Sequence, residues 1–180
     1  MVILNTFYPE EKGTLVTTAT DTKTPVKSFS TMDNIAMLTF TGTGLVGNNG
    51  IAGRLFNALR DVNVIIISQA CSEMAINIVI NDKDADRAKE AILKEFDFEI
   101  KGKKCINPIE AERGYTILAM VGEGMKNAAG VTGRAFTTLG NNNVNIHLIA
   151  QGSSEINVSI VIKSSDAQKA LEALHNEFFK

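Results

Sequence analysis

A glycine-rich stretch, GTGLVGNNG from Gly42 to Gly50, suggests a ligand-binding loop more directly than any other part of the sequence. It follows an apolar run and precedes a helical pattern. Glycines spaced Gly-x-Gly-x-x-Gly between a strand and a helix are typical of dinucleotide-binding loops, where backbone amides meet a pyrophosphate. Small residues at a helix start also leave N–H groups open to other anions, a carboxylate among them. The stretch therefore raises two hypotheses, a nucleotide site and a carboxylate site.

Residues further along weaken the nucleotide hypothesis. A Rossmann unit places an acidic residue about 20 positions after the glycines to bind the ribose, but Ser68 and Gln69 stand there. No Gly-Lys-Ser/Thr sequence occurs, which excludes a P-loop. A simple tight turn explains Gly42 and Gly44. It does not explain the small residues that continue into the helix start, and these favour the carboxylate site.

The chain contains the same pattern twice. GTGLVGNNGIAGRLFNAL aligns with GEGMKNAAGVTGRAFTTL at an offset of 80, and VNVIIISQACSEMAINIVI aligns with VNIHLIAQGSSEINVSIVI at an offset of 82. The Gly53-Arg54 pair returns as Gly133-Arg134. A repeat of about 80 residues indicates a tandem duplication. The second copy has Asn127 at the third glycine of the fingerprint, which again speaks against a dinucleotide.

Both copies show the same order of elements. A strand-like run, IAMLTF or YTILAM, leads into the glycine loop and then into a helix with one apolar face. Two short strands follow as a hairpin, and a second helix closes the copy. With one further strand this order is the split βαβ, or ferredoxin-like, arrangement. We therefore predict an α+β fold of two ferredoxin-like βαββαβ units in tandem, with helices on one face of antiparallel sheets.

The fourth strand of each unit needs a source. In the first copy FEI (98–100) and CINPI (105–109) follow the second helix, whereas the second copy ends at Lys180. The leader contains GTLVTT and VKSFS between residues 13 and 30, and we expect part of it to fill the missing place in one unit. The expected organisation is a leader at 1–30, a first unit at 31–107 and a second unit at 108–180.

Polar residues that occur in both copies are the candidate ligand contacts. Gln69 and Gln151 share one place at a strand end, where a side-chain amide offers a donor and an acceptor. Asn63 and Asn145 precede that strand and fit a turn asparagine as well as a ligand contact. The glutamates of the CSE and SSE turns, which are Glu73 and Glu155, are interpreted as solvated charges.

Catalytic and metal-binding residues are not indicated by the pattern. His147 aligns with Ile65, and no nucleophile or base occurs in both copies. Cys71 and Cys105 have no metal-ligand spacing and are expected to be free thiols. No acidic pair, zinc constellation or serine triad can be argued from spacing. We expect no catalytic residue, no metal and no cofactor.

Charge and hydropathy exclude two further classes of partner. The net charge is −2 with scattered basic residues, so there is no basic stripe for nucleic acid and no polybasic membrane patch. No apolar run approaches the roughly 20 residues that span a bilayer. The N-terminus, MVILNTFYPEE, lacks the features of a signal peptide. We expect a cytoplasmic location.

Taken together, these motifs resemble the C-terminal regulatory region of an aspartate kinase, which is a tandem of ACT domains. The resemblance covers essentially the whole chain and is strongest in the two glycine loops, VNVIIISQACSE and NVNIHLIAQGSSEINVSIVI; the leader ILNTFYPEEKGTLV is similar to the junction with the kinase domain. It implies a βαββαβ fold, amino acids bound where two units pair, and feedback control of aspartate phosphorylation. It also implies a kinase domain as partner and a homodimer or higher oligomer through pairing of ACT units, while this chain itself lacks the kinase domain.

The GTG, IISQ and IAQGSSE forms are most similar to threonine-responsive members, so threonine is the expected effector and lysine the next. The NNG and AAG forms depart from the usual hydrophobic-small-Gly form of the first loop, which leaves the ligand and the use of both pockets open. An alternative is a free-standing ACT sensor that acts on another protein. The expected ligand-binding residues are Asn48, Asn49, Gly50, Ile51, Ala52, Asn63 and Gln69 in the first unit, and Asn127, Ala128, Ala129, Gly130, Val131, Asn145 and Gln151 in the second.

Overall fold

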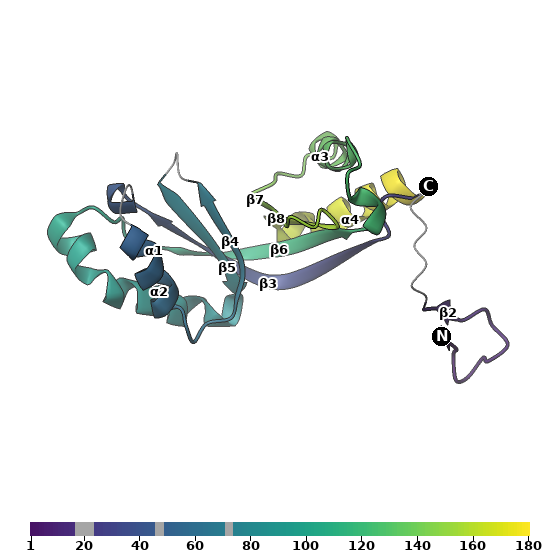
Figure 1. Ribbon diagram of the computed structural model, residues 1–180, viewed down its shortest axis with the longest axis horizontal. Coiled ribbons are helices and arrows are strands. Elements are labelled where there is room, and N and C mark those ends of the chain that lie inside the picture. The colour runs from purple at the N-terminus through teal and green to yellow at the C-terminus, as the bar shows by residue number, and fades with distance from the viewer. Residues whose placement is uncertain (17–23, 46–48, 71–73) are drawn as a thin grey trace.

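The computed structural model describes residues 1–16, 24–45, 49–70 and 74–180, with only the backbone of Asn49 and Ala70 (Figure 1). The strands are β1 (Val2–Ile3), β2 (Thr14–Leu15), β3 (Ser28–Thr41), β4 (Val64–Ala70), β5 (Ala75–Asn81), β6 (Ala111–Val121), β7 (Leu148–Gln151) and β8 (Asn157–Lys163). The α-helices are α1 (Asn49–Ala58), α2 (Ala85–Glu95), α3 (Val131–Asn141) and α4 (Ala167–Phe179). Short 3-10 turns, η1 (Thr43–Leu45), η3 (Asp82–Asp84), η5 (Glu123–Met125) and η6 (Ser164–Asp166), precede the α-helices or lie in the glycine loops, and a π-helical segment, η4 (Phe98–Lys103), follows α2.

Six strands form one antiparallel sheet in the order β4-β5-β3-β6-β8-β7, and its two central strands each serve both units. Ile35–Thr41 of β3 pairs with β5, whereas Ser28–Met32 of the same strand pairs with β6. Conversely, Tyr115–Val121 of β6 pairs with β8, while Ala111 and Glu112 pair back onto β3. The α+β fold is confirmed, but the two units share a single sheet because they exchange strands.

Both central strands change register at equivalent places. Asn34 in β3 has φ 58°, and Gly114 in β6, 80 positions later, has φ 78°. The ladder between β3 and β6 is irregular between Met32 and Ile35. A left-handed residue forms a bulge that re-aims the strand, and Asn and Gly are the residues that tolerate this conformation. Each strand thereby turns from one unit to the other.

The prediction that FEI (98–100) contributes to the fourth strand of the first unit is wrong. FEI lies in η4, where the amide of Ile100 donates to the carbonyl of Phe96 at 2.9 Å and the chain stays helical. Lys104 adopts a left-handed conformation and ends this segment. CINPI then runs beside β3, with the amide of Asn107 donating to the carbonyl of Thr41 at 2.8 Å. Phe98, Glu99 and Ile100 suit a helical turn as well as a strand, so the local sequence could not distinguish the two structures.

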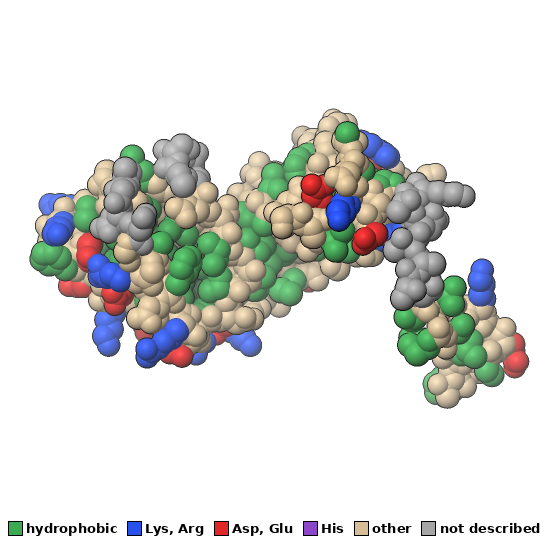
Figure 2. Space-filling view, viewed as in Figure 1, with side chains coloured by type: hydrophobic (Ala, Val, Ile, Leu, Met, Phe, Trp, Pro, Cys, Tyr) green, Lys and Arg blue, Asp and Glu red, His purple; other side chains and the backbone are tan. Residues whose placement is uncertain are grey.

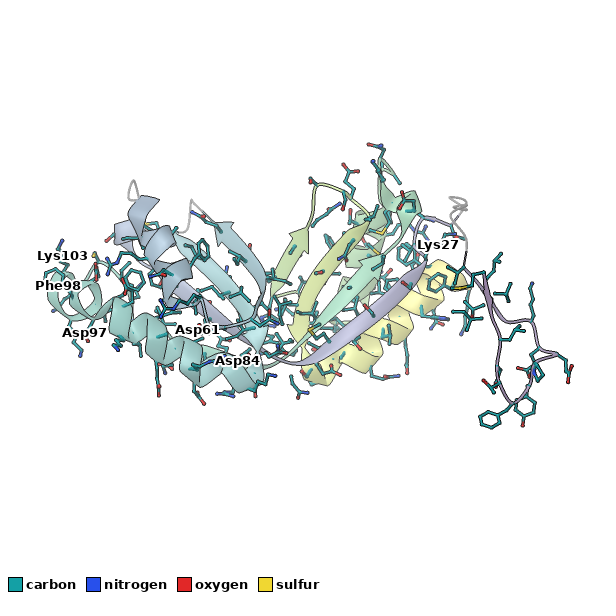
Figure 3. The ribbon with its side chains drawn as sticks, turned by 60° about the horizontal axis from the view of Figure 1, so that its bottom comes forward. Lys27, Asp61, Asp84, Asp97, Phe98 and Lys103 are labelled. Carbon is teal, nitrogen blue, oxygen red and sulfur yellow. The ribbon has the colours of Figure 1, made fainter. Side chains whose placement is uncertain are left out.

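Two hydrophobic cores lie between the sheet and the helices (Figure 3). The first is built on Leu38, Leu55 and Ile92, and the second on the equivalent Leu118, Ala135 and Leu174, all fully buried. α1 and α2 cover the half of the sheet that ends in β4, which we call the first unit. α3 and α4 cover the half that ends in β7, which we call the second unit.

A third core lies on the face of the sheet that carries no helix. It joins side chains of both units, including Ile66 of β4, Leu148 of β7 and Tyr115 of β6. The outer strands β4 and β7 therefore approach each other across this face. Because this core joins the two units, they form one packed body.

The N-terminal hairpin of β1 and β2 stands apart from this body (Figure 1). Thr14 and Leu15 of GTLVTT pair with β1 and do not join the large sheet, and the end of that motif lies outside the described residues. Hydrophobic side chains gather on the hairpin surface (Figure 2). Phe7 is 87% exposed and Tyr8 62%. An exposed apolar surface of this kind indicates an interaction site.

Candidate functional site

The opening glycines of the two loops are required by close backbone contacts. A methyl group on Gly42 would lie 2.2 Å from the carbonyl oxygen of Cys105, and one on Gly122 would lie 2.0 Å from that of Pro25. The amide of Gly44 donates to the carbonyl of Cys105 at 2.9 Å. These glycines therefore pack closely against neighbouring backbone. This supports their role in a tight turn and does not support binding of a pyrophosphate.

The loops deliver the chain to two helix starts. Asn49 is already the first residue of α1, so Gly50, Ile51 and Ala52 form its first turn, and Asn48 lies outside the described residues. The side chain of Ile51 is 3% exposed and belongs to the core. Only its backbone is thus available to a ligand, which is compatible with the expected contact through helix-start amides.

The second helix start leaves amides without acceptors. α3 begins at Val131 after Gly130, which has φ 84°, and no side chain caps it. The first intrahelical bond runs from the amide of Arg134 to the carbonyl of Gly130. Within residues 111–180, the amides of Ala129, Gly130 and Val131 have no hydrogen-bond acceptor. Uncapped N–H groups at a helix start attract an anion.

Two predicted contacts of the second loop are already used within the chain. The amide of Ala128 donates to the carbonyl of Met125, and the amide of Asn127 donates to the carboxylate of Glu155 at 2.8 Å. Glu155, in the turn between β7 and β8, is therefore not a freely solvated charge, which corrects the sequence interpretation. Its carboxylate accepts a hydrogen bond from one loop amide. The Ser-Glu pair that the CSE and SSE turns share was the sequence signal for this contact, and its first-copy member, Glu73, lies outside the described residues.

Gln69 and Gln151 point to the side of the sheet that carries the helices. Gln69 lies opposite Ile76, and Gln151 lies opposite Val158, and both of these partners belong to the helix-side cores. Directly opposed residues of antiparallel strands share a face. Both glutamines are exposed and make no side-chain hydrogen bond to described residues, so their amides are open to a ligand.

The glutamines and the asparagines lie at opposite ends of the outer strands. Ala75 of β5 pairs with both Thr41 and Ala70, so the end of β4 that carries Gln69 and the end of β3 that leads toward α1 lie on either side of the same β5 residue. Asn63 precedes β4, about 20 Å from Gln69 along an extended strand. Asn145 holds the equivalent place in the second unit, with its amide 3.4 Å from His147 Nε2. Turn residues are the better account of both asparagines.

An arginine fixes each candidate helix to its neighbour. Arg54 of α1 donates to Glu95 and to Glu99, and Arg134 of α3 donates to Glu177. The hydrogen bond from Arg54 holds the pKa of the Glu99 carboxyl below its ordinary value, and the two carboxylates raise the pKa of Arg54. The repeated Gly-Arg pair was the sequence signal for these contacts, although the sequence did not show their partners.

The two candidate sites lie at opposite ends of the shared central strands. β3 runs from Ser28, beside the second loop, to Thr41, beside the first, which is about 40 Å along an extended strand. In Figure 3, Lys27 labels the end of the sheet beside the second loop, and Phe98 and Lys103 label the end beside the first loop. One chain therefore presents two separate sites.

The described residues contain neither a metal-binding cluster nor a membrane-spanning helix. No group of three or more His, Cys, Asp or Glu residues is placed to hold a metal ion there. Among the same residues, no helix has the length and apolar character to cross a membrane.

The sequence matches a known domain family and known proteins. The ACT domain family matches residues 38–96 and 118–178. The bifunctional aspartokinase/homoserine dehydrogenase 2 of Arabidopsis thaliana is 37% identical over 187 aligned positions, which cover 99% of this chain and 20% of that protein. This chain thus spans about a fifth of that relative's length.

Solved structures show the same architecture. The aspartate kinase of Clostridium acetobutylicum, described as an allosteric enzyme, superposes with a TM-score of 0.84 at 27% identity, over 97% of this chain and 40% of that one. Aspartokinase III of E. coli, in complex with lysine and aspartate, superposes with a TM-score of 0.73 at 22% identity, over 96% of this chain and 37% of that one. The chain belongs to the ACT domain family, as a tandem of two ACT domains that matches the regulatory region of aspartokinases.

Proposed function

We propose that the chain is the regulatory region of an aspartate kinase, in which a bound end-product amino acid inhibits phosphorylation of aspartate by a kinase domain. The observation that carries the proposal is that each unit has a helix start after its glycine loop and an exposed glutamine on the helix side of its outer strand. Its context is a tandem of ACT domains that matches an aspartokinase over 99% of this chain. No residue of this chain is assigned to catalysis, and no cofactor is required.

A zwitterion suits each pocket. In the first unit the carboxylate would accept hydrogen bonds from the amides of Gly50, Ile51 and Ala52, while the amide of Gln69 takes the ammonium group or a side-chain hydroxyl. In the second unit the amides from Ala129 to Val131 and the side chain of Gln151 would do the same. We leave Asn63 and Asn145 out of the pockets because they lie at the other end of the strands.

Threonine is the effector we favour, and lysine is next. The IISQ and IAQGSSE forms support threonine, since they resemble threonine-responsive members of the family. The lysine complex of aspartokinase III supports lysine as the second choice. A polar side chain of either kind can reach the glutamine amide from a carboxylate held at the helix start.

We propose that a second copy of the chain completes each effector site. The outer strands β4 and β7 carry unpaired backbone groups, which favours continuation of the sheet by another chain. Ile67 and Ile149 occupy equivalent places on these strands and are 48% and 44% exposed. A dimer or higher oligomer follows, and sedimentation of a monomer at high concentration would contradict it.

The N-terminal hairpin is the surface we assign to the kinase domain. Its leader motif resembles the kinase junction, and Phe7, Tyr8 and Leu15 expose apolar surface that the body of this chain does not cover. Burial against a kinase domain would remove that surface from water. We also propose the cytoplasmic location expected from the sequence.

A thermal-shift and calorimetric screen of threonine, lysine, methionine and aspartate tests the proposal. An amino acid present at 100 times its Kd should stabilise the fold by about 2.7 kcal/mol. Gln69→Ala and Gln151→Ala, which remove one candidate contact each, should weaken binding of that amino acid. Absence of a shift with all four amino acids would overturn the proposal.

A further inference from the structure

The stretch of chain that follows α2 holds both sides of the first glycine loop. On one side the carbonyl of Cys105 accepts the hydrogen bond from Gly44 and lies against Gly42. On the other side the carboxylate of Glu99 accepts a hydrogen bond from Arg54, one turn into α1. The loop that starts α1 is therefore held before and after by one neighbouring segment.

We call this stretch, residues 98–107, the crossover segment, because it leads into β6 and so into the second unit. Within the segment, the amide of Cys105 donates to the carbonyl of Glu99 at 3.1 Å, and at its end the amide of Asn107 donates to the carbonyl of Thr41. Ile106 is 2% exposed and anchors the segment in the first core. The segment is therefore packed against the first core and continues directly into β6.

Arg54 makes the link between α1 and the crossover segment. Its guanidinium donates to a carboxylate oxygen of Glu95 at 2.7 Å and to the carbonyl of the same residue at 2.8 Å, and it lies 4.6 Å from the ring centroid of Phe96. Those contacts tie α1 to α2 alone. Only the bond to Glu99, whose side chain is 14% exposed, reaches the crossover segment.

The second unit repeats the contacts between the arginine and the second helix. Arg134 donates to the carboxylate and the carbonyl of Glu177 and lies 4.8 Å from the ring of Phe178. The glycine contact of that unit is equivalent too, since Gly122 packs against Pro25, which lies 80 positions before Cys105. Arg134 therefore offers a matched control within the same chain.

We propose that Arg54 is a positioning residue of the first effector pocket, and that its bond to Glu99 couples occupancy of this pocket to the crossover segment and thence to the second unit. The inference rests on the proposed function of the pocket. A ligand changes a distant region only through a differential effect on two arrangements of the chain. The Arg54–Glu99 bond provides a contact through which the ligated helix start acts on the crossover segment.

Amide hydrogen exchange on the whole chain tests the coupling, with and without saturating threonine and, in a second series, lysine. In the wild type and in Arg134→Gln, the bound amino acid should slow exchange of the Ile100 and Cys105 amides by about fivefold or more, a modest linkage for partly exposed charges. In Glu99→Gln and in Arg54→Gln most of this slowing should disappear. For Glu99→Gln the calorimetric Kd should change by less than about threefold.

Equal slowing in Glu99→Gln and the wild type, with affinity intact, would overturn the coupling while leaving the proposed function in place. Absence of threonine and lysine binding to the wild type would overturn the pocket itself, and the coupling with it. If Arg54→Gln does not fold, Glu99→Gln decides, because it leaves the contacts between Arg54 and α2 in place.

Discussion

The two units differ in which part of the chain holds the candidate loop. In the first unit, the crossover segment contacts both the opening glycines and, through Glu99, the helix start. In the second unit, the leader contacts Gly122, and Glu155 contacts the loop amide of Asn127. The backbone contacts of the opening glycines are nevertheless equivalent, because Pro25 and Cys105 lie 80 positions apart, as Gly42 and Gly122 do. The described difference is the bond from Arg54 to Glu99 in the first unit, so the two sites need not respond alike to one amino acid.

The strand exchange predicts that the units unfold together. Leu38→Ala and its equivalent Leu118→Ala each remove a fully buried side chain, and each should lower the free energy of unfolding by about 3 kcal/mol. Because β3 and β6 belong to both units, either variant should shift one cooperative transition. Urea denaturation followed by circular dichroism measures this. Two separate transitions in either variant would show that the units are independent.

The glycine contacts predict a smaller loss that is similar in both units. Gly42→Ala and Gly122→Ala place a methyl group about 2 Å from a backbone carbonyl, and overpacking of this kind costs about 2 kcal/mol. Gly53→Ala is the control, since a methyl group there meets nothing and the site lies inside α1. It should stabilise the fold by about 0.5 kcal/mol. The same denaturation curves apply, and an unaffected Gly42→Ala would refute the close approach.

The Glu155 contact predicts an effect confined to the second unit. Glu155→Ala removes the acceptor of the Asn127 amide and should cost about 1 kcal/mol, because the bond is charge-assisted but exposed and the freed amide can meet water. Glu123→Ala, at an exposed site in the same loop, should change stability by less than about 0.5 kcal/mol. Thermal unfolding compares the two variants. Equal losses would mean that Glu155 is an ordinary solvated charge.

The Arg54–Glu99 pair predicts a pH-dependent effect confined to the first unit. Since the hydrogen bond lowers the pKa of Glu99 below its ordinary 4.5, the unfolded chain takes up this proton first as pH falls. The stabilisation is therefore fully present above the ordinary, unfolded-state pKa, and it is lost as pH falls through the lower pKa of the folded state. Glu99→Gln should lower stability by at most about 1 kcal/mol at neutral pH and less in acid. Urea denaturation at both conditions, with exposed Glu90→Gln as control, measures this; a loss that persists unchanged in acid would contradict it.

Local patterns in the sequence predicted most of the elements. The apolar faces of α1 and α3, the hairpins of β4 with β5 and β7 with β8, and the repeat itself depend on neighbours close in the chain. The places of Gln69 and Gln151 near the ends of their strands were predicted for the same reason. FEI was predicted wrongly because so short a stretch fits a helical turn equally well. Asn63 and Asn145 were included because repetition cannot tell which end of a strand faces a pocket.

By itself the sequence determined the duplication, the α+β class and the two helix starts, because periodicity and turn residues act over a few positions. Only the tertiary structure decided that β3 and β6 are exchanged between units, since their pairing joins residues about 80 positions apart and depends on the bulges at Asn34 and Gly114. The same holds for Glu155 against Asn127 and Glu99 against Arg54. These contacts depend on which backbone segments the shared sheet brings together, and no local pattern contains that information.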